Sequence, residues 1–307
     1  MFTLYVNDIV GSSLKNAEII TYADDTVILF HEKSWDQVYH CATVGMAHVA
    51  GLLDKNLLTL NIKKSKHIAF SKTSASSPGT DFELKIHSCL QTTGSQKICS
   101  CSRIDRTTKI KYLGIIIDEN MTYKDHILDL SGRVRKLIFI MKKLRNCTPS
   151  DILRQVYLAL CQSIMQYCIS VWGSAGKTVF ITLERAQRAL IKVTLKKPFR
   201  FPTKTLYEEF KVLRMRQLFV LSATVKAHKA LLNRTDYRYL LTKRVFRLPL
   251  PRATSLLSRK CPAYAHANTY NKVNNQCDIK ECTVVACKKK VKEWLLTRSY
   301  DETEDLI

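Results

Sequence analysis

The sequence of 307 residues predicts an α+β fold with three regions, residues 1–118, 119–235 and 236–307. Short apolar runs separated by turn residues dominate the first region, which predicts strands with one helix among them. Apolar residues at helical spacing fill the second region, which predicts an all-helical domain. The third region is less regular, and we expect a mixed tail with a terminal helix. Strands followed by helices are typical of the α+β class.

A β-hairpin is predicted over residues 19–30, where two apolar runs flank Tyr22-Ala23-Asp24-Asp25. Asp is common in turns, so an Asp pair alone is an ordinary turn feature. A tight turn would hold both carboxylates at the exposed edge of a sheet. There they could bind Mg²⁺ or Mn²⁺ and leave positions open for phosphate oxygens. Asp24 and Asp25 are therefore the candidate metal ligands and catalytic residues.

A helix is predicted to begin after Ser34, with Gln37 placed for a capping box. Its apolar residues recur near helical spacing, and we expect this helix to pack on the back of the sheet. They are Trp35, Val38, Ala42, Met46, Val49, Leu52 and Leu53.

Strands are predicted at residues 58–60 and 68–70, on either side of a basic cluster formed by Lys63, Lys64 and Lys66. Each of these lysines could be part of a functional site or could simply be exposed to solvent in a turn. Residues 71–80 are rich in Ser, Thr, Gly and Pro, which predicts a loop.

A small antiparallel hairpin is predicted from residues 82–87 and 98–104, because both stretches alternate in period two. A strand follows at residues 110–118. Gly114 lies within it, and a missing side chain permits close approach of a ligand to the backbone. Cys99 and Cys101, with Cys89 nearby, do not have the spacing of paired zinc knuckles, so idle thiols are the preferred interpretation.

The second region is predicted to contain helices with one apolar and one basic face. The helix that includes Val134 places Leu137, Ile138, Met141 and Leu144 on one side. After Pro149, Ser150 or Asp151 is expected to cap a helix that continues to Trp172. A turn at residues 173–176 precedes a helix over residues 179–195, with Leu183, Ala186, Leu190 and Val193 facing inward. The basic residues of the two faces are Arg133, Arg135, Lys136, Lys142, Lys143, Arg145, Arg185, Arg188 and Lys192.

The third region is expected to form short strands or loops, with Asn271 among the turn residues, and then a helix over residues 284–296. Its thiols and one imidazole suggest a metal site, but the five-residue intervals would scatter them around a helix. They are Cys261, His266, Cys277, Cys282 and Cys287.

The composition indicates a nucleic-acid partner. Lys and Arg number 49 against 26 Asp and Glu, a net charge of +23, and such an excess is an electrostatic footprint for phosphate backbones. Hydrophobic residues make up 46%, enough for a buried core. No run of about 18 apolar residues exists, so no membrane span is expected. Asp8 in the first apolar stretch argues against a signal peptide, and the 11 cysteines indicate reduced thiols, so an intracellular location, nuclear or cytoplasmic, is expected.

Several stretches resemble, in the same order, reverse transcriptases of non-LTR (LINE-like) retrotransposons, especially the Jockey type. They are residues 2–9, the Tyr22-Ala23-Asp24-Asp25 hairpin, residues 58–70, the run Lys111-Tyr112-Leu113-Gly114, and residues 153–173. The resemblance covers nearly the whole chain.

The resemblance implies that residues 1–118 form part of a polymerase palm, residues 119–235 a thumb and residues 236–307 a tail. Lys64 and Lys66 match a lysine thought to protonate or neutralise the leaving pyrophosphate. The strand with Gly114 supports the primer end in the family. The basic thumb helices would then follow an RNA template and DNA primer duplex through its backbone and shape.

The polymerase of this family begins before the first residue here, with fingers and a first palm strand that carries another metal-binding Asp. We therefore expect a C-terminal part of a reverse transcriptase, in which Asp24 and Asp25 hold Mg²⁺ or Mn²⁺ weakly and from one side only. Such a part would be inactive alone and catalytic only with the missing N-terminal half. The alternative is a non-enzymatic nucleic-acid-binding remnant or co-opted protein, in which the two carboxylates are relics.

Overall fold

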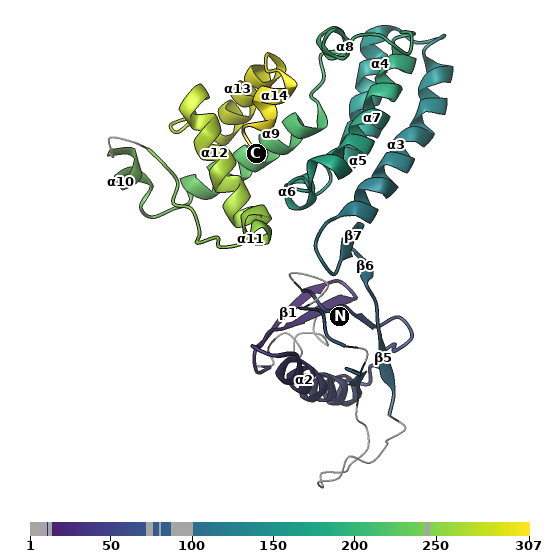
Figure 1. The fold of residues 1–307 in the computed structure, drawn as a ribbon, viewed down its shortest axis with the longest axis vertical. Helices are drawn as coiled ribbons and strands as arrows, with labels where there is room; N and C mark the ends of the chain where they lie inside the picture. The colour runs from purple at the N-terminus through teal and green to yellow at the C-terminus, as the bar shows by residue number, and fades with distance from the viewer. Residues whose placement is uncertain (1–10, 12–13, 72–75, 80, 87–100, 243–245) are drawn as a thin grey trace. The chain divides into compact units, whose positions relative to one another are not determined.

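The computed structural model describes residues 11, 14–71, 76–79, 81–86, 101–242 and 246–307. The chain divides into two compact units, and Figure 1 labels most of their helices and strands. The first unit is Met1–Tyr112 with Asp118–Met121, and the second is Leu113–Ile117 with Thr122–Ile307. The predicted segment 2–9 lies outside the described residues.

The first unit contains the predicted hairpin. Strand β1 (Ala17–Tyr22) pairs antiparallel with β2 (Asp25–Phe30), and Tyr22 lies opposite Asp25. Ala23 and Asp24 are therefore the two turn residues. The predicted β-hairpin is confirmed.

Helix α2 (Trp35–Lys55) begins where predicted, and the Ser34 hydroxyl accepts a hydrogen bond from the Gln37 N–H at 3.4 Å. Ala42 and Val49 are buried as expected, but the pattern missed Tyr39 and Gly45. A Cβ atom on Gly45 would lie 2.7 Å from the Phe30 ring. The absence of a side chain at Gly45 therefore lets α2 pack closely on β2.

A small sheet has β5 (Arg103–Arg106) at its centre, parallel to β3 (Lys66–His67) and antiparallel to β4 (Leu84–Lys85). The predicted pairing of residues 82–87 with 98–104 is confirmed for the described part. The predicted strands at 58–60 and 68–70 are wrong. Asn61 accepts hydrogen bonds from the N–H groups of Lys64 and Ser65, so this stretch forms a turn and leaves a two-residue strand after it.

Strands β6 (Lys109–Tyr112) and β7 (Ile115–Asp118) form a hairpin, so the predicted single strand over 110–118 is wrong. The turn residues Leu113 and Gly114 both have positive φ, 45° and 83°. Two consecutive left-handed residues match the type I′ turn that joins twisted antiparallel strands. The boundary between the two units falls within this hairpin.

From Lys124 onward the second unit is helical, which agrees with the prediction for residues 119–235, and the same unit continues to Ile307. Helices α3 (Lys124–Leu144) and α7 (Lys177–Thr194) lie side by side (Figure 1). Between them the chain forms α4 (Ser150–Val156), a π-helical turn (Tyr157–Gln162), α5 (Ser163–Gln166) and α6 (Ile169–Trp172). The predicted continuous helix to Trp172 is therefore wrong, because the chain leaves the helix at Tyr167 and Cys168 adopts a left-handed φ of 49°. Pro149, and not Ser150 or Asp151, is the N-cap residue of α4.

Helix α8 (Thr203–Phe210) leads to α9 (Met215–Leu232), the central helix of the unit. Helices α6, α12, α13 and α14 all contact α9. Every residue from Met215 to Leu221 is buried, which explains why α9 lacks a clear polar face. The remaining helices are α10 (Tyr237–Thr242), α11 (Leu256–Lys260), α12 (Pro262–Cys277), α13 (Val284–Leu296) and α14 (Tyr300–Glu304).

The predicted terminal helix over 284–296 is confirmed, but the short strands or loops before it are wrong. Asn271 lies within α12, where its side-chain amide bonds the N–H and carbonyl of Leu248 at 2.7 and 2.9 Å. A residue typical of turns is thus stable in a helix because its polar group is satisfied by another segment. None of the described helices is both long and apolar enough to cross a membrane.

Candidate metal-binding hairpin and nucleic-acid interface

The β1–β2 turn presents Asp24 and Asp25 to solvent, and both side chains are exposed. Ala23 before them has a φ of 53°, a left-handed conformation that favours glycine. For a residue with a Cβ atom this conformation costs roughly 1–2 kcal/mol. Strained backbone of this kind is concentrated at functional sites. The sequence pattern did not single out Ala23.

The two carboxylates are suited to a hard cation, because Mg²⁺ is commonly bound through one or two carboxylates with water completing its coordination. In the described part of the chain, no group of three or more His, Cys, Asp or Glu side chains is placed to hold a metal ion. Asp24 and Asp25 would therefore supply two ligands at most from the described residues.

Lys64 and Lys66, which match the lysine thought to act on the leaving pyrophosphate, also lie in the first unit. Lys64 is exposed in the turn formed around Asn61, and Lys63 is exposed beside it. The Lys66 ammonium forms an ion pair with Asp105 at 3.1 Å, and both side chains are largely exposed. Exposed pairs of this kind contribute little to stability.

Gly114 lies in the second unit, against Tyr167. The Tyr167 hydroxyl donates to the Leu113 carbonyl at 2.7 Å, and a Cβ atom on Gly114 would lie 3.4 Å from the Tyr167 ring. A hollow of about 260 Å³ opens beside this turn and brings Gly114 and Arg133 together. It is lined by Leu113, Gly114, His126, Leu130, Arg133, Ile164 and Tyr167.

His126, which the sequence did not predict as a site residue, lies in this hollow. Its exposed fraction is 1%, and burial lowers the pKa of its imidazole to about 4, so the ring is uncharged at physiological pH. Nδ1 accepts a hydrogen bond from the Ile116 N–H at 3.5 Å. The proton of the neutral ring therefore lies on Nε2, which is buried and has no hydrogen-bond partner.

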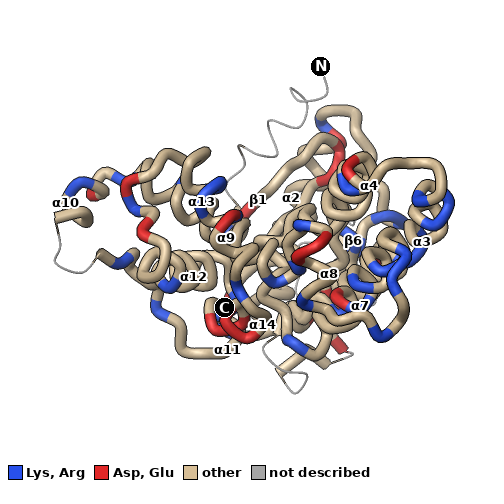
Figure 2. Tube along the Cα trace, turned by 90° about the horizontal axis from the view of Figure 1, so that it is seen from above, with Lys and Arg blue, Asp and Glu red and all other residues tan. Residues whose placement is uncertain are grey.

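Helix α3 separates an apolar face from a basic face, as predicted. Ile127, Leu130, Val134 and Met141 are buried, whereas the basic residues of its second half point to solvent. No Asp or Glu occurs between residues 130 and 145. Figure 2 shows Lys and Arg positions gathered along α3. The exposed ones are Arg133, Arg135, Lys136, Lys142 and Lys143.

The other predicted basic residues differ in their surroundings. Arg145 is partly buried and donates to the Val193 carbonyl at 2.7 Å, at the end of α7. Lys192 is partly buried, donates to the Phe199 carbonyl and lies over the Phe199 ring. Arg188 is partly buried and Arg185 is exposed. Of the predicted basic residues, the exposed ones are therefore concentrated on α3.

The cysteines suggested for zinc do not form a described metal site. Cys89 and Cys99 lie outside the described residues. The His266 ring binds the Ser170 carbonyl through Nε2 at 2.8 Å. Cys287 is buried, which raises the pKa of its thiol to about 12 and keeps it protonated.

Comparison with known proteins finds three curated polymerases of Drosophila mobile elements. The chain is 21% identical over 198 residues to "Probable RNA-directed DNA polymerase from transposon BS" of Drosophila melanogaster, which is 64% of this chain and 20% of that protein. It is 22% identical over 209 residues to "RNA-directed DNA polymerase from mobile element jockey" of Drosophila funebris, 67% of this chain and 21% of that protein. This chain is similar to jockey-type reverse transcriptases.

The resemblance to jockey-type non-LTR polymerases inferred from the sequence is thereby confirmed, and the Drosophila melanogaster jockey polymerase is similar at 22% identity. The chain spans about a fifth of the length of these three relatives. No protein-family model matches the chain. No solved structure matches it either.

Proposed function

We propose that the chain is the part of a non-LTR retrotransposon reverse transcriptase that holds the template–primer duplex and contributes Asp24 and Asp25 to the metal site. The similarity to RNA-directed DNA polymerases supports this proposal. The observation that carries it is the basic face of α3, where five exposed cations occur with no acidic residue between positions 130 and 145.

The length of this face suits a nucleic-acid backbone. From Arg133 to Lys143 the helix rises about 15 Å, at 1.5 Å per residue. A duplex presents phosphate charges continuously over such a distance. Phe139 lies among the cations, 67% exposed, and the Lys143 ammonium lies 5.6 Å from its ring centroid. Contacts of this kind read backbone and shape and require no base-specific side chain.

Duplex binding by the purified chain tests the proposal. We expect RNA–DNA hybrids of unrelated sequence to bind with similar affinity, because the exposed cations meet phosphates. The logarithm of the affinity should fall linearly with the logarithm of the salt concentration, as counterions are released. Filter binding across a salt series measures both. An affinity that is insensitive to salt, or that is confined to one sequence, contradicts the proposal.

The polymerase activity of this chain is expected to depend on a further metal ligand. Two-metal chemistry requires ligands that hold two ions roughly 3.5–4 Å apart, and Asp24 and Asp25 supply one side of such a site. This 307-residue polypeptide alone should therefore not extend a primer on RNA with dNTPs and Mg²⁺. Together with the preceding part of a jockey-type polymerase it should do so, and Asp24→Ala should abolish that activity. Primer extension by the polypeptide alone, lost in Asp24→Ala, would disprove the dependence on a further ligand.

Metal binding by the hairpin is a separate prediction. Mn²⁺ should bind the isolated chain weakly, since two carboxylates and water form an incomplete ligand set. The binding should disappear when Asp24 and Asp25 are both changed to Asn, with the fold unaffected because both side chains are exposed. Titration calorimetry with Mn²⁺ makes the comparison. Tight binding that survives the double substitution would place the metal elsewhere.

A further inference from the structure

A second surface with the chemistry of a nucleic-acid site lies far along the sequence from α3. A shallow hollow of about 470 Å³ opens between the end of α12 and one flank of α13. Its lining combines an indole ring, an ammonium group and two side-chain amides. The lining residues are Asn275, Gln276, Cys277, Asp278, Lys290 and Trp294.

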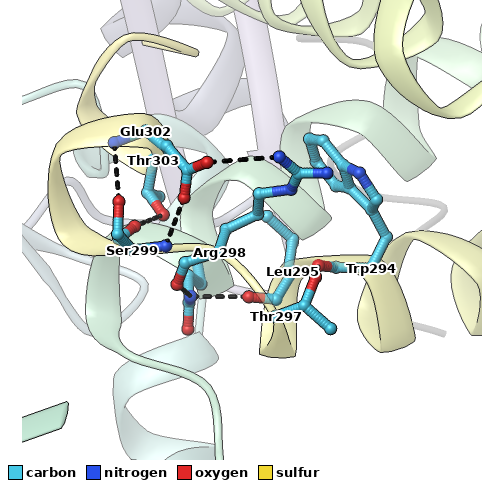
Figure 3. A network of polar contacts seen from close by, with 8 residues as sticks. Trp294, Leu295, Thr297, Arg298, Ser299, Glu302 and Thr303 are labelled. Atoms are coloured by element: carbon cyan, nitrogen blue, oxygen red, sulfur yellow. Dashed lines mark hydrogen bonds and ion pairs between the residues drawn. The ribbon is translucent and has the colours of Figure 1, made fainter.

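The indole of Trp294 is held in place by a chain of polar contacts (Figure 3). The Arg298 guanidinium lies 4.7 Å from the Trp294 ring centroid and donates to Glu302 at 3.2 Å. Glu302 in turn accepts from the Ser299 N–H at 2.7 Å, within the capping box of α14. A ring fixed in this way is a preorganised stacking platform.

Two local features beside the hollow are unsatisfied or strained. Trp294 Nε1 is buried and has no hydrogen-bond partner among the described residues. Asp278 adopts φ 28° and ψ 85°, and its carbonyl accepts a hydrogen bond from the Lys290 ammonium at 2.8 Å. Strained backbone clusters at active sites and ligand-binding segments.

The geometry of α13 places one cation at the hollow. Lys290 and Trp294 are four residues apart and share the flank that borders the hollow, whereas Lys289 lies about 100° around the helix from Lys290, on the outward side. Lys288 and Lys292 are also four residues apart, on the opposite flank. All four lysines are exposed. The buried face of α13 is formed by Cys287, Val291 and Leu295.

We propose that this hollow binds single-stranded nucleic acid, with an unpaired base stacked at Trp294 and the adjoining phosphate on Lys290. Stacking on an aromatic ring combined with backbone cations is the common mode of single-strand binding. The amides of Asn275 and Gln276 can bond base edges. The carboxylate of Asp278 repels phosphate, so the base lies toward α12 and the phosphates lie toward α13.

An acidic peptide is the competing occupant, and the lining disfavours it. Such a peptide would use the lysines but not the aromatic ring, and it would meet Asp278. A base-paired duplex is also disfavoured, because its bases are not free to stack on a side chain. The proposal goes beyond the duplex interface of α3, and single-strand binding here is independent of it.

Fluorescence anisotropy with labelled oligouridine, using the full chain, tests the proposal. Trp294→Leu should weaken binding about tenfold, a change of about 1.4 kcal/mol. Trp294→Phe should retain binding, because a phenyl ring still stacks. Affinity for an RNA–DNA hybrid should change less than about twofold in both variants, since that duplex is expected on α3. A failure of duplex binding alone would therefore affect the proposed function and not this inference.

A matched pair of single variants controls for net charge. Lys290→Gln should weaken oligouridine binding more than Lys288→Gln, although each removes one charge from α13. Equal losses in the two variants would overturn the proposal. So would an unchanged affinity in a folded Trp294→Leu variant, or competition by poly-glutamate as effective as that by oligouridine. If Trp294→Leu fails to fold, the two lysine variants and Trp294→Phe still decide the outcome.

Discussion

Arg216→Ala is expected to lower the free energy of unfolding by about 3–5 kcal/mol, the cost of breaking a buried charge pair from one side. The Arg216 side chain is 4% exposed, and its Nε lies 2.8 Å from the Glu304 carboxylate. Its other nitrogens donate to the carbonyls of Gly173 and Ala175 at 3.1 and 3.2 Å, and it lies over the Phe180 ring. The substitution would remove the donor to these two carbonyls and the ion-pair partner of the Glu304 carboxylate.

The decrease in the free energy of unfolding caused by Arg216→Ala should also depend on pH. Burial raises the pKa of Glu184, and the Arg216 charge opposes this rise. Without Arg216 the pKa of Glu184 rises further. A carboxyl group whose pKa is higher in the folded chain than in the unfolded chain stabilises the fold at pH values below its unfolded pKa. This stabilisation is lost as the pH rises through its folded pKa. The Arg216→Ala variant should therefore be destabilised less at about pH 5 than at about pH 7.5.

Urea unfolding of the wild type and the variant at both pH values measures these differences. Arg185→Ala is the control, because Arg185 is exposed on α7 and its loss should change stability by no more than about 0.5 kcal/mol. A loss below about 1 kcal/mol in Arg216→Ala would show that the carbonyls and Glu304 find other partners.

Changing Arg135, Lys136, Lys142 and Lys143 together to Gln should weaken duplex binding at least about 100-fold at low salt. Each phosphate contact contributes about 0.9 to the magnitude of the slope of log affinity against log salt. The loss of four contacts would therefore reduce the magnitude of this slope by about 3.6. These side chains are exposed, so the fold should be retained. The reduction should be similar for duplexes of unrelated sequence.

A second quadruple variant distinguishes an effect of the basic face of α3 from an effect of the total charge of the chain. It removes four exposed cations elsewhere in the helical unit, so the change in net charge is the same. The substituted residues are Lys204, Lys229, Arg238 and Arg259. If this control lowers the affinity and slope as much as the α3 variant, the interaction depends on net charge and the α3 interface is wrong. Electrophoretic mobility shifts across a salt series provide both quantities.

Elements with a strong local signal were predicted from the sequence. The β1–β2 hairpin has two apolar runs around Ala23 and Asp24, and α2, α3, α7 and α13 each have apolar residues at helical spacing. Such patterns are local, because the burial of one face repeats within a few residues. The resemblance to jockey-type polymerases was likewise found in short runs of sequence.

Elements whose stability comes from distant partners were mispredicted. Helix α12 was expected as strands or loops, because Asn271 is typical of turns, yet its amide is satisfied by Leu248, 23 residues away. The run around Gly114 was expected as one strand, whereas it folds back at Leu113. The Tyr167 hydroxyl, 54 residues away, bonds the carbonyl at that turn.

For the candidate sites, the sequence by itself determined the adjacent carboxylates Asp24 and Asp25 and the basic face of α3, since both follow from residue types at short spacing. Only the tertiary structure decided that Arg145 bonds the end of α7, that His126 lines the hollow beside Gly114, and that Trp294 lies against α12. Burial, desolvation and hydrogen bonding depend on which distant segments pack together, and a linear pattern does not contain that information.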